Sequence, residues 1–193
     1  LGGPIEVGRV LPFAKRQMVG PFIFFDHIGP VDLTAGIDGS ADVRAHPHIG
    51  LSTVTYLFSG ELMHRDSLGY ELPIRPEEVN WMTAGRGITH SERFERARAV
   101  GDRIHGIQAW VALPREHEET APAFTHYESG DLPFWDTAAV RGHLIAGSAY
   151  GLTSGAKTHS PLFYAHLEMR AGATAEIPGG HSERAVYVAT GAV

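Results

Sequence analysis

The chain has 193 residues, of which 43% are hydrophobic, so it is long enough to bury a core of its own. It carries 16 Lys and Arg against 22 Asp and Glu, a formal net charge of -6, and the scattered cationic residues predict no direct binding to nucleic acid. There is no Cys, which excludes disulfides and thiolate metal sites and leaves imidazole and carboxylate groups for any metal chemistry. No apolar run approaches the roughly 18 residues needed to cross a membrane, and a cytoplasmic location fits this composition.

Short segments rich in β-branched and aromatic residues predict strands, and the 23 Gly and 12 Pro supply turns between them. Between two of these segments, the charged stretch Pro114–Thr120 is expected to be a solvated turn or short helix. Many closely spaced strands indicate an all-β sandwich, jelly roll or barrel, and of these the jelly roll best accommodates a metal in its interior. The clearest predicted strands lie in Gly50–Gly60, His105–Pro114, Leu162–Met169 and Arg184–Val193.

A short internal repeat favours two related halves. Tyr56 precedes Gly60 by the same interval that separates Tyr187 from Gly191, and each copy follows a segment rich in His and Gly. The same match could also be a coincidence of two strand ends. We expect residues 1–130 to form an N-terminal metal-binding barrel, and residues 131–193 to be a linker and the start of a second barrel that is incomplete in this chain.

The stretch "RAHPHIGLST" places His46 and His48 two residues apart at the start of a predicted strand. Residues i and i+2 of a strand share one face, so both imidazoles can point inward. A single pair of this kind among 12 histidines is weak evidence, because surface or hydrogen-bonded histidines can show the same spacing. A second pair is needed to support a metal site.

The stretch "VNWMTAGRGITHSE" supplies that second pair, His90 and Glu92, after a turn rich in Gly. Together with His46 and His48 they predict a site of three imidazoles and one carboxylate for a single transition metal. Such a set suits Fe(II), Ni, Co, Mn or Cu(II) and leaves two octahedral positions free. The similar pair His166 and Glu168 has no partner pair, and we expect it to lie on a solvent-facing side or to be structural.

Four stretches, "HPHIGLSTVTYLFSGE", "RDSLG", "WMTAGRGITHSE" and "HGIQAWVALP", resemble the pirin family of bicupins, and the similarity extends from about Val10 to the end of the chain. The resemblance implies two cupin jelly-roll barrels. It also implies that the N-terminal barrel binds a non-haem metal, with Fe(II) favoured and Ni, Co, Mn, Cu or Zn as alternatives. The ligands implied are His46, His48, His90 and Glu92.

The sequence departs from the family pattern at a turn, where "RPEEVNWM" has Glu77 and Glu78 in place of the usual Gly–Asp. The family places an amide that lines the pocket at the position of Gln108, although a strand Gln can equally bond to the backbone. His64 and His105 lie outside both pairs and are expected in the core or on the surface. Trp110 is expected in the core.

Two functions follow from the resemblance. The first is a dioxygenase that cleaves flavonols of the quercetin type with O₂, with Glu92 as both metal ligand and general base for the substrate hydroxyl. The second is a non-enzymatic regulator in which the state of the iron alters contacts with protein partners. We favour the dioxygenase, because four ligands with vacant positions form a chemical site.

Overall fold

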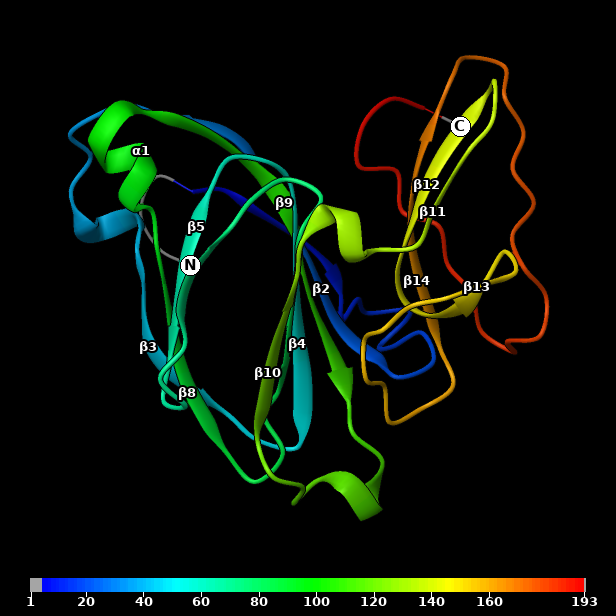
Figure 1. The fold of residues 1–193 in the computed structure, drawn as a ribbon, viewed down its shortest axis with the longest axis horizontal. Helices are drawn as coiled ribbons and strands as arrows, with labels where there is room; N and C mark the ends of the chain where they lie inside the picture. Colours follow the sequence, from blue (N-terminus) through cyan, green and yellow to red (C-terminus); the bar gives the residue numbers. More distant parts are fainter. Residues whose placement is uncertain (1–4, 193) are drawn as a thin grey trace.

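The computed structural model describes residues 5–192, and antiparallel strands dominate them (Figure 1), which confirms the all-β prediction. No helix in this described part is long and apolar enough to cross a membrane. The strands are β1 Val7–Leu11, β2 Phe22–Leu33, β3 Val43–His48, β4 Leu51–Ser59, β5 Leu62–Asp66, β6 Glu71–Ile74, β7 Val79–Thr83, β8 Ile88–Arg93, β9 Asp102–Ala112, β10 Ala123–Tyr127, β11 Phe134–Asp136, β12 Val140–Ala149, β13 Leu152–Thr153 and β14 Phe163–Met169.

Two sheets from the first part of the chain form a jelly roll. The six-stranded sheet has the order β1-β2-β9-β4-β7-β10, and the four-stranded sheet has the order β3-β8-β5-β6. Figure 1 shows the second sheet facing the first, with the short helix α1 (Glu95–Val100) beside one end. The predicted turn after β9 contains the 3-10 helix Arg115–His117, which confirms a short helical turn there.

Alternation of side chains gives the six-stranded sheet two buried faces. On one face, Leu57 and Ile104 pack with Phe94 in the apolar interior between the two sheets. On the other face, Val54 and Tyr56 pack against a third sheet. Because neither face is left to solvent, β4 is apolar on one face and mixed on the other, and its sequence lacks a polar side.

The third sheet contains β11, β12, β13 and β14, with β12 at its centre. Its buried residues Leu144 and Ile145 have no exposed surface, and Ile145 packs in the cluster that contains Val54. The described strands of the first two sheets end at Tyr127, and those of the third begin at Phe134. The division into barrel domains at residue 130 stays a prediction.

The predicted strand at Arg184–Val193 is wrong for the residues that the structure describes, since 184–192 contain no strand. A strand needs a neighbour that accepts its backbone hydrogen bonds, and the composition of a segment does not provide one. Here the Tyr187 ring packs edge-on against Phe25 of β2, with ring centroids 5.5 Å apart. This segment therefore meets the six-stranded sheet through side chains.

The turn between β6 and β7 has a residue in the left-handed conformation. Glu77 has φ of 66°, and its amide donates a hydrogen bond of 2.9 Å to the carbonyl of Leu57. A Gly would adopt this conformation without the steric cost that Cβ imposes. The departure from the family's Gly–Asp turn thus falls at a strained position.

Candidate metal centre

Strands β3 and β8 bring the two halves of the predicted ligand set together. They pair antiparallel, and in their register His46 lies directly opposite His90. His48 is two residues from His46 and therefore lies on the same face of β3. Three imidazoles from two distant parts of the chain are thus gathered on the barrel side of one sheet.

The three imidazoles have the geometry of a ligand group. Each offers one ring nitrogen, and the three nitrogens lie within 4.8 Å of one another. The Nε2 atoms of His48 and His90 are 3.0 Å apart, and both side chains are buried. Neutral imidazole nitrogens converging in this way can bind a divalent transition ion.

A backbone contact orients the first of these rings. Nδ1 of His46 donates a hydrogen bond of 2.8 Å to the carbonyl oxygen of Arg44. A proton on Nδ1 leaves the lone pair on Nε2, which is the arrangement that metal-binding histidines usually have. The site is therefore prepared before any ion binds.

Burial keeps the other two imidazoles neutral. Desolvation, followed by the nearby His46, lowers the pKa of His48 to about 4. Desolvation, followed by the neighbouring imidazoles of His46, His48 and His64, lowers the pKa of His90 to about 2. An ion that arrives at neutral pH therefore meets no charged imidazole at either residue, and the proton that one Nε2 atom donates to the other would move to Nδ1 of its own ring.

Glu92 lies beside this group on β8. Its Oε1 atom is 3.7 Å from Nδ1 of His90, too far for a hydrogen bond and on the side of the ring away from Nε2. The three nitrogens thus form the tight group, and the carboxylate is its immediate neighbour. Burial raises the pKa of Glu92 to about 7.

An unpaired buried oxygen of Glu92 is consistent with a donor set that holds a cation. In the described part of the chain, three buried side-chain polar atoms lack a hydrogen-bond partner, and two of them are Nδ1 of His90 and Oε2 of Glu92. Leaving such atoms unpaired costs about 1–3 kcal/mol each, more for a charged group. A divalent ion held by the imidazoles would offset that cost for Oε2 of Glu92 when the carboxylate turns toward it, whereas Nδ1 of His90 faces away from the Nε2 atoms that would hold the ion.

The predicted Gly turn positions β8. Gly85 has φ of 52°, and a Cβ there would lie 2.0 Å from the carbonyl oxygen of Thr120. Two backbone hydrogen bonds hold this turn in place. The amide of Gly50 donates to the carbonyl oxygen of Gly85, and the amide of Arg86 donates to the carbonyl oxygen of Thr120. This close approach fixes where the strand bearing His90 begins.

Aromatic and amide groups of β9 lie beside the centre. The Trp110 ring meets the His48 ring edge to face at 5.1 Å and stacks on Phe24 at 4.0 Å. Gln108 is two residues along the same face of β9, and its side-chain oxygen accepts a hydrogen bond of 2.8 Å from Thr55. The Gln108 side chain thus bonds to another side chain and not to the backbone. Trp110 was expected only in the core, but its ring contacts His48 of the imidazole group.

Sequence reasoning also missed a buried His–Asp pair next to the centre. His64 and Asp66 in β5 share a hydrogen bond of 3.0 Å, and the His64 ring lies 5.3 Å from that of His90. In the register of β5 with β8, His64 lies opposite Glu92. The spacing of two residues, as in the two recognised pairs, was the signal that could have found it.

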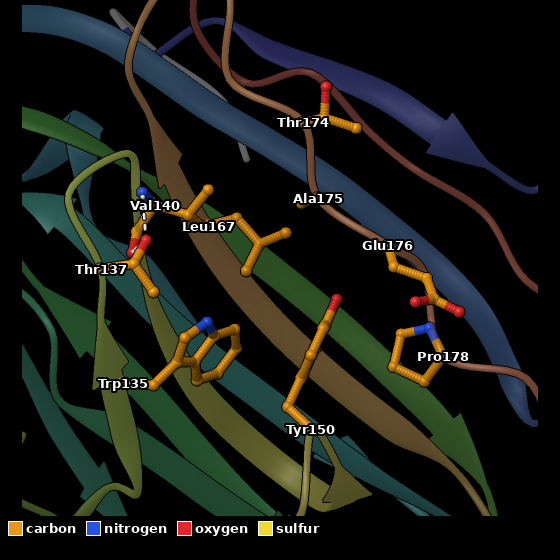
Figure 2. Close-up of a pocket in the computed structure, with 9 residues that line it drawn as sticks. All are labelled: Trp135, Thr137, Val140, Tyr150, Leu167, Thr174, Ala175, Glu176 and Pro178. Atoms are coloured by element: carbon orange, nitrogen blue, oxygen red, sulfur yellow. Dashed lines mark hydrogen bonds between the residues drawn. The ribbon is translucent and has the colours of Figure 1, made fainter.

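A cavity of about 400 Å³ lies elsewhere in the molecule (Figure 2), and no predicted site residue lines it. Trp135 and Tyr150 stack at its floor, with ring centroids 4.4 Å apart, and the segment 174–178 forms its far side. The cavity borders the third sheet and lies apart from the histidine cluster.

Known proteins resemble this chain over most of its length. The family model described as Pirin matches residues 5–111. A pirin-like protein of Caulobacter vibrioides is 57% identical over 192 residues, which are 99% of this chain and 67% of the relative. A Pseudomonas aeruginosa protein, provisionally named a quercetin 2,3-dioxygenase, is 41% identical over 92% of this chain and 54% of its own length.

Among solved structures, a quercetin 2,3-dioxygenase from Acinetobacter baumannii superposes with a TM-score of 0.77 at 36% identity. The match covers 88% of this chain and 57% of that one. The chain thus spans between about half and two thirds of the length of these relatives. The jelly roll described above is accordingly of the cupin type.

Proposed function

This chain belongs to the pirin family, and we propose that it acts as a metal-dependent dioxygenase that cleaves flavonols of the quercetin type with O₂. The observation that carries the proposal is the group of three imidazoles, two of them buried, whose ring nitrogens lie within 4.8 Å of one another. The names of the Acinetobacter and Pseudomonas relatives support the choice of substrate class.

We propose His46, His48 and His90 as metal ligands and Glu92 as the fourth. When bound, the ion would supply Lewis acidity and open positions for a substrate oxygen and O₂, and Fe(II) is our first choice. The unpaired, buried Oε2 atom of Glu92 supports its participation, because a buried carboxylate needs a positive partner.

Glu92 has a second role in this proposal. A flavonol reacts as its anion, so a group of the site must accept the proton of its hydroxyl. Burial raises the pKa of Glu92 to about 7, and a bound cation would lower it again, so Glu92 would be an ionised carboxylate that can accept this proton. The proton would therefore move to Glu92.

Residues of β2 and β9 would hold the planar substrate. Trp110 and Phe24 present stacked aromatic rings next to His48, and aromatic rings favour contact with other flat apolar surfaces. The amide of Gln108 would orient polar groups of the substrate through its NH₂ group, since its oxygen already accepts from Thr55. Trp110 and Gln108 would thus position the substrate and take no part in proton transfer.

The decisive test measures quercetin consumption and O₂ uptake by protein of confirmed metal content. We expect one O₂ per flavonol for the wild type and a loss of about 10²–10⁴-fold in turnover for Glu92→Gln loaded with excess metal. Glu116→Gln, an exposed carboxylate on a 3-10 turn, is the matched control and should keep full turnover.

If the metal-loaded wild type consumes no flavonol of any substitution pattern, the iron-dependent regulatory role takes the place of the enzyme. If Glu92→Gln keeps both its metal and its turnover, the proposed base is wrong while the dioxygenase assignment survives.

A further inference from the structure

A second pair of histidines meets outside the candidate metal centre. His27 in β2 and His105 in β9 have their Nε2 atoms 2.7 Å apart. His27 lies opposite Ile107 in the register of these strands, so His105 is two residues further along the same face. Neither residue belongs to the spaced pairs of the sequence, and only the pairing of β2 with β9 brings them together.

This pair is on the opposite face of the six-stranded sheet from the barrel interior. The His105 ring contacts Phe58 at 4.7 Å, and Phe58 packs with Tyr56 on the face turned toward the third sheet. His27 and His105 are both partly exposed, so water and small ions can reach them. The pair is thus separate from His46, His48 and His90.

A tyrosine from the C-terminal segment sets the state of the pair. The Tyr187 hydroxyl lies 2.7 Å from Nδ1 of His27. When Nδ1 donates to this hydroxyl, the Nε2 atom of His27 carries a lone pair, and Nε2–H of His105 donates to it. Two neutral rings then account for both short contacts without any charge.

The spacing of the two nitrogens is close to that of two ligands on one ion. Nitrogens at about 2.0–2.1 Å from a metal are about 2.9 Å apart at a right angle and about 3.3 Å apart at a tetrahedral angle. The observed 2.7 Å needs to widen by only a few tenths of an ångström to reach the right-angled arrangement. Square-planar or tetragonal nitrogen sites are typical of Cu(II) and Ni(II).

We propose that His27 and His105 form a second metal site, which takes a tetragonal divalent ion of the Cu(II) type through their two Nε2 atoms. On binding, the proton of His105 moves from Nε2 to Nδ1, so both rings stay neutral and no proton is released. Water fills the remaining positions. Tyr187 is the positioning residue, because its hydroxyl holds the His27 tautomer that leaves Nε2 free.

The charges around the pair permit a cation. The nearby Arg103 is held by Asp32 through contacts of 3.0 and 2.8 Å, which reduces its repulsion of an incoming ion. The site does not depend on the proposed dioxygenase function and adds an ion to the single metal that the sequence predicts.

The test is equilibrium dialysis of the whole chain against Cu(II), with glycine as a competing ligand to strip ions from single surface histidines. We expect His105→Gln and His27→Gln each to bind one equivalent fewer than the wild type, while His117→Gln binds the same number. The electron paramagnetic resonance signal of the lost equivalent should be missing from both variants. Unchanged binding in His105→Gln and His27→Gln would overturn the proposal.

A milder variant guards against misfolding. Tyr187→Phe removes only the hydroxyl, and we expect it to keep the number of bound ions while weakening one of them about tenfold, the scale of an orienting contact. Wild-type affinity for every bound ion in Tyr187→Phe would show that the hydroxyl does not orient His27. If Tyr187→Phe keeps wild-type affinity but folded His27→Gln still binds one ion fewer, the two-histidine site is supported and only the role of Tyr187 is wrong.

Discussion

The Nε2 atoms of His48 and His90 lie 3.0 Å apart, although the two residues are 42 positions apart in the chain. Both rings are buried, and burial gives both a lowered pKa, so neither carries the charge that would push them apart. The register of β3 with β8 creates this contact, and the ligand function proposed for the site rests on it.

Replacing one of these ligands should release the ion. We expect His90→Ala to weaken metal binding by more than about 100-fold, since even the loss of an orienting partner costs 10–100-fold. Elemental analysis after dialysis measures the metal content, and the rise in melting temperature on adding Fe(II) or Ni(II) should vanish in parallel. His117→Ala is the control for removing a histidine elsewhere, and full metal retention by His90→Ala would contradict the ligand set.

The Gly turn before β8 should tolerate no side chain. Gly85→Ala places a Cβ 2.0 Å from a backbone carbonyl oxygen, and the backbone has to move. Gly36→Ala is the matched control, because Gly36 also has positive φ but nothing within 4 Å of the added Cβ. We expect the control to lose about 1 kcal/mol of unfolding free energy and Gly85→Ala to lose at least about 2 kcal/mol more. Urea unfolding measures both, and equal losses would refute the steric explanation.

His166 should make the protein less stable in acid. Its Nδ1 atom lies 3.0 Å from the Tyr56 hydroxyl, and burial lowers its pKa, an effect that Glu168 partly opposes. Below pH 6.5 the unfolded chain binds a proton at this residue while the folded chain does not, so the free energy of unfolding falls as the pH falls. The loss ends where the folded imidazole is itself protonated.

The variant His166→Gln isolates this effect because Gln does not titrate. The stability of the wild type relative to His166→Gln should decrease from pH 7.5 to pH 5.5, by at most about 1.4 kcal/mol per pH unit below 6.5. Urea unfolding at several pH values, with the same metal content in both proteins, gives the difference. A difference that is constant or grows toward acid would show that His166 is not held neutral.

The strained turn before β7 offers a stabilising substitution. Glu77→Gly removes the steric strain of a non-Gly residue in the left-handed conformation, which is about 1–2 kcal/mol. Gly also makes the unfolded chain more flexible, which costs about 0.4–1 kcal/mol, so we expect a net gain of about 0.5 kcal/mol in unfolding free energy. The Glu77 carboxylate lies 3.9 Å from the Arg141 guanidinium, and the loss of such a long, weak ion pair costs little. The gain should appear as a raised urea midpoint, and Glu77→Gln, which removes the charge but keeps Cβ, should not show it.

The sequence by itself indicated much of the barrel and its site. Strand segments such as Leu51–Ser59 and Phe163–Met169 were readable because β-branched and aromatic residues mark them. The spacing of two within each ligand pair was informative because alternate residues of a strand share a face. Local periodicity therefore sufficed to nominate His46, His48, His90 and Glu92.

Only the tertiary structure decided which residues meet across strands. Nothing in the local sequence marks His27 and His105 as a pair. Their contact depends on the pairing of β2 with β9 and on the irregularity between Ile28 and Val31. The residues 184–192, strand-like in composition, find no strand partner among the described residues. Side-chain alternation is a property of a few neighbouring residues, whereas register and partner choice are set by packing of the whole chain, so the former can be read from sequence and the latter cannot.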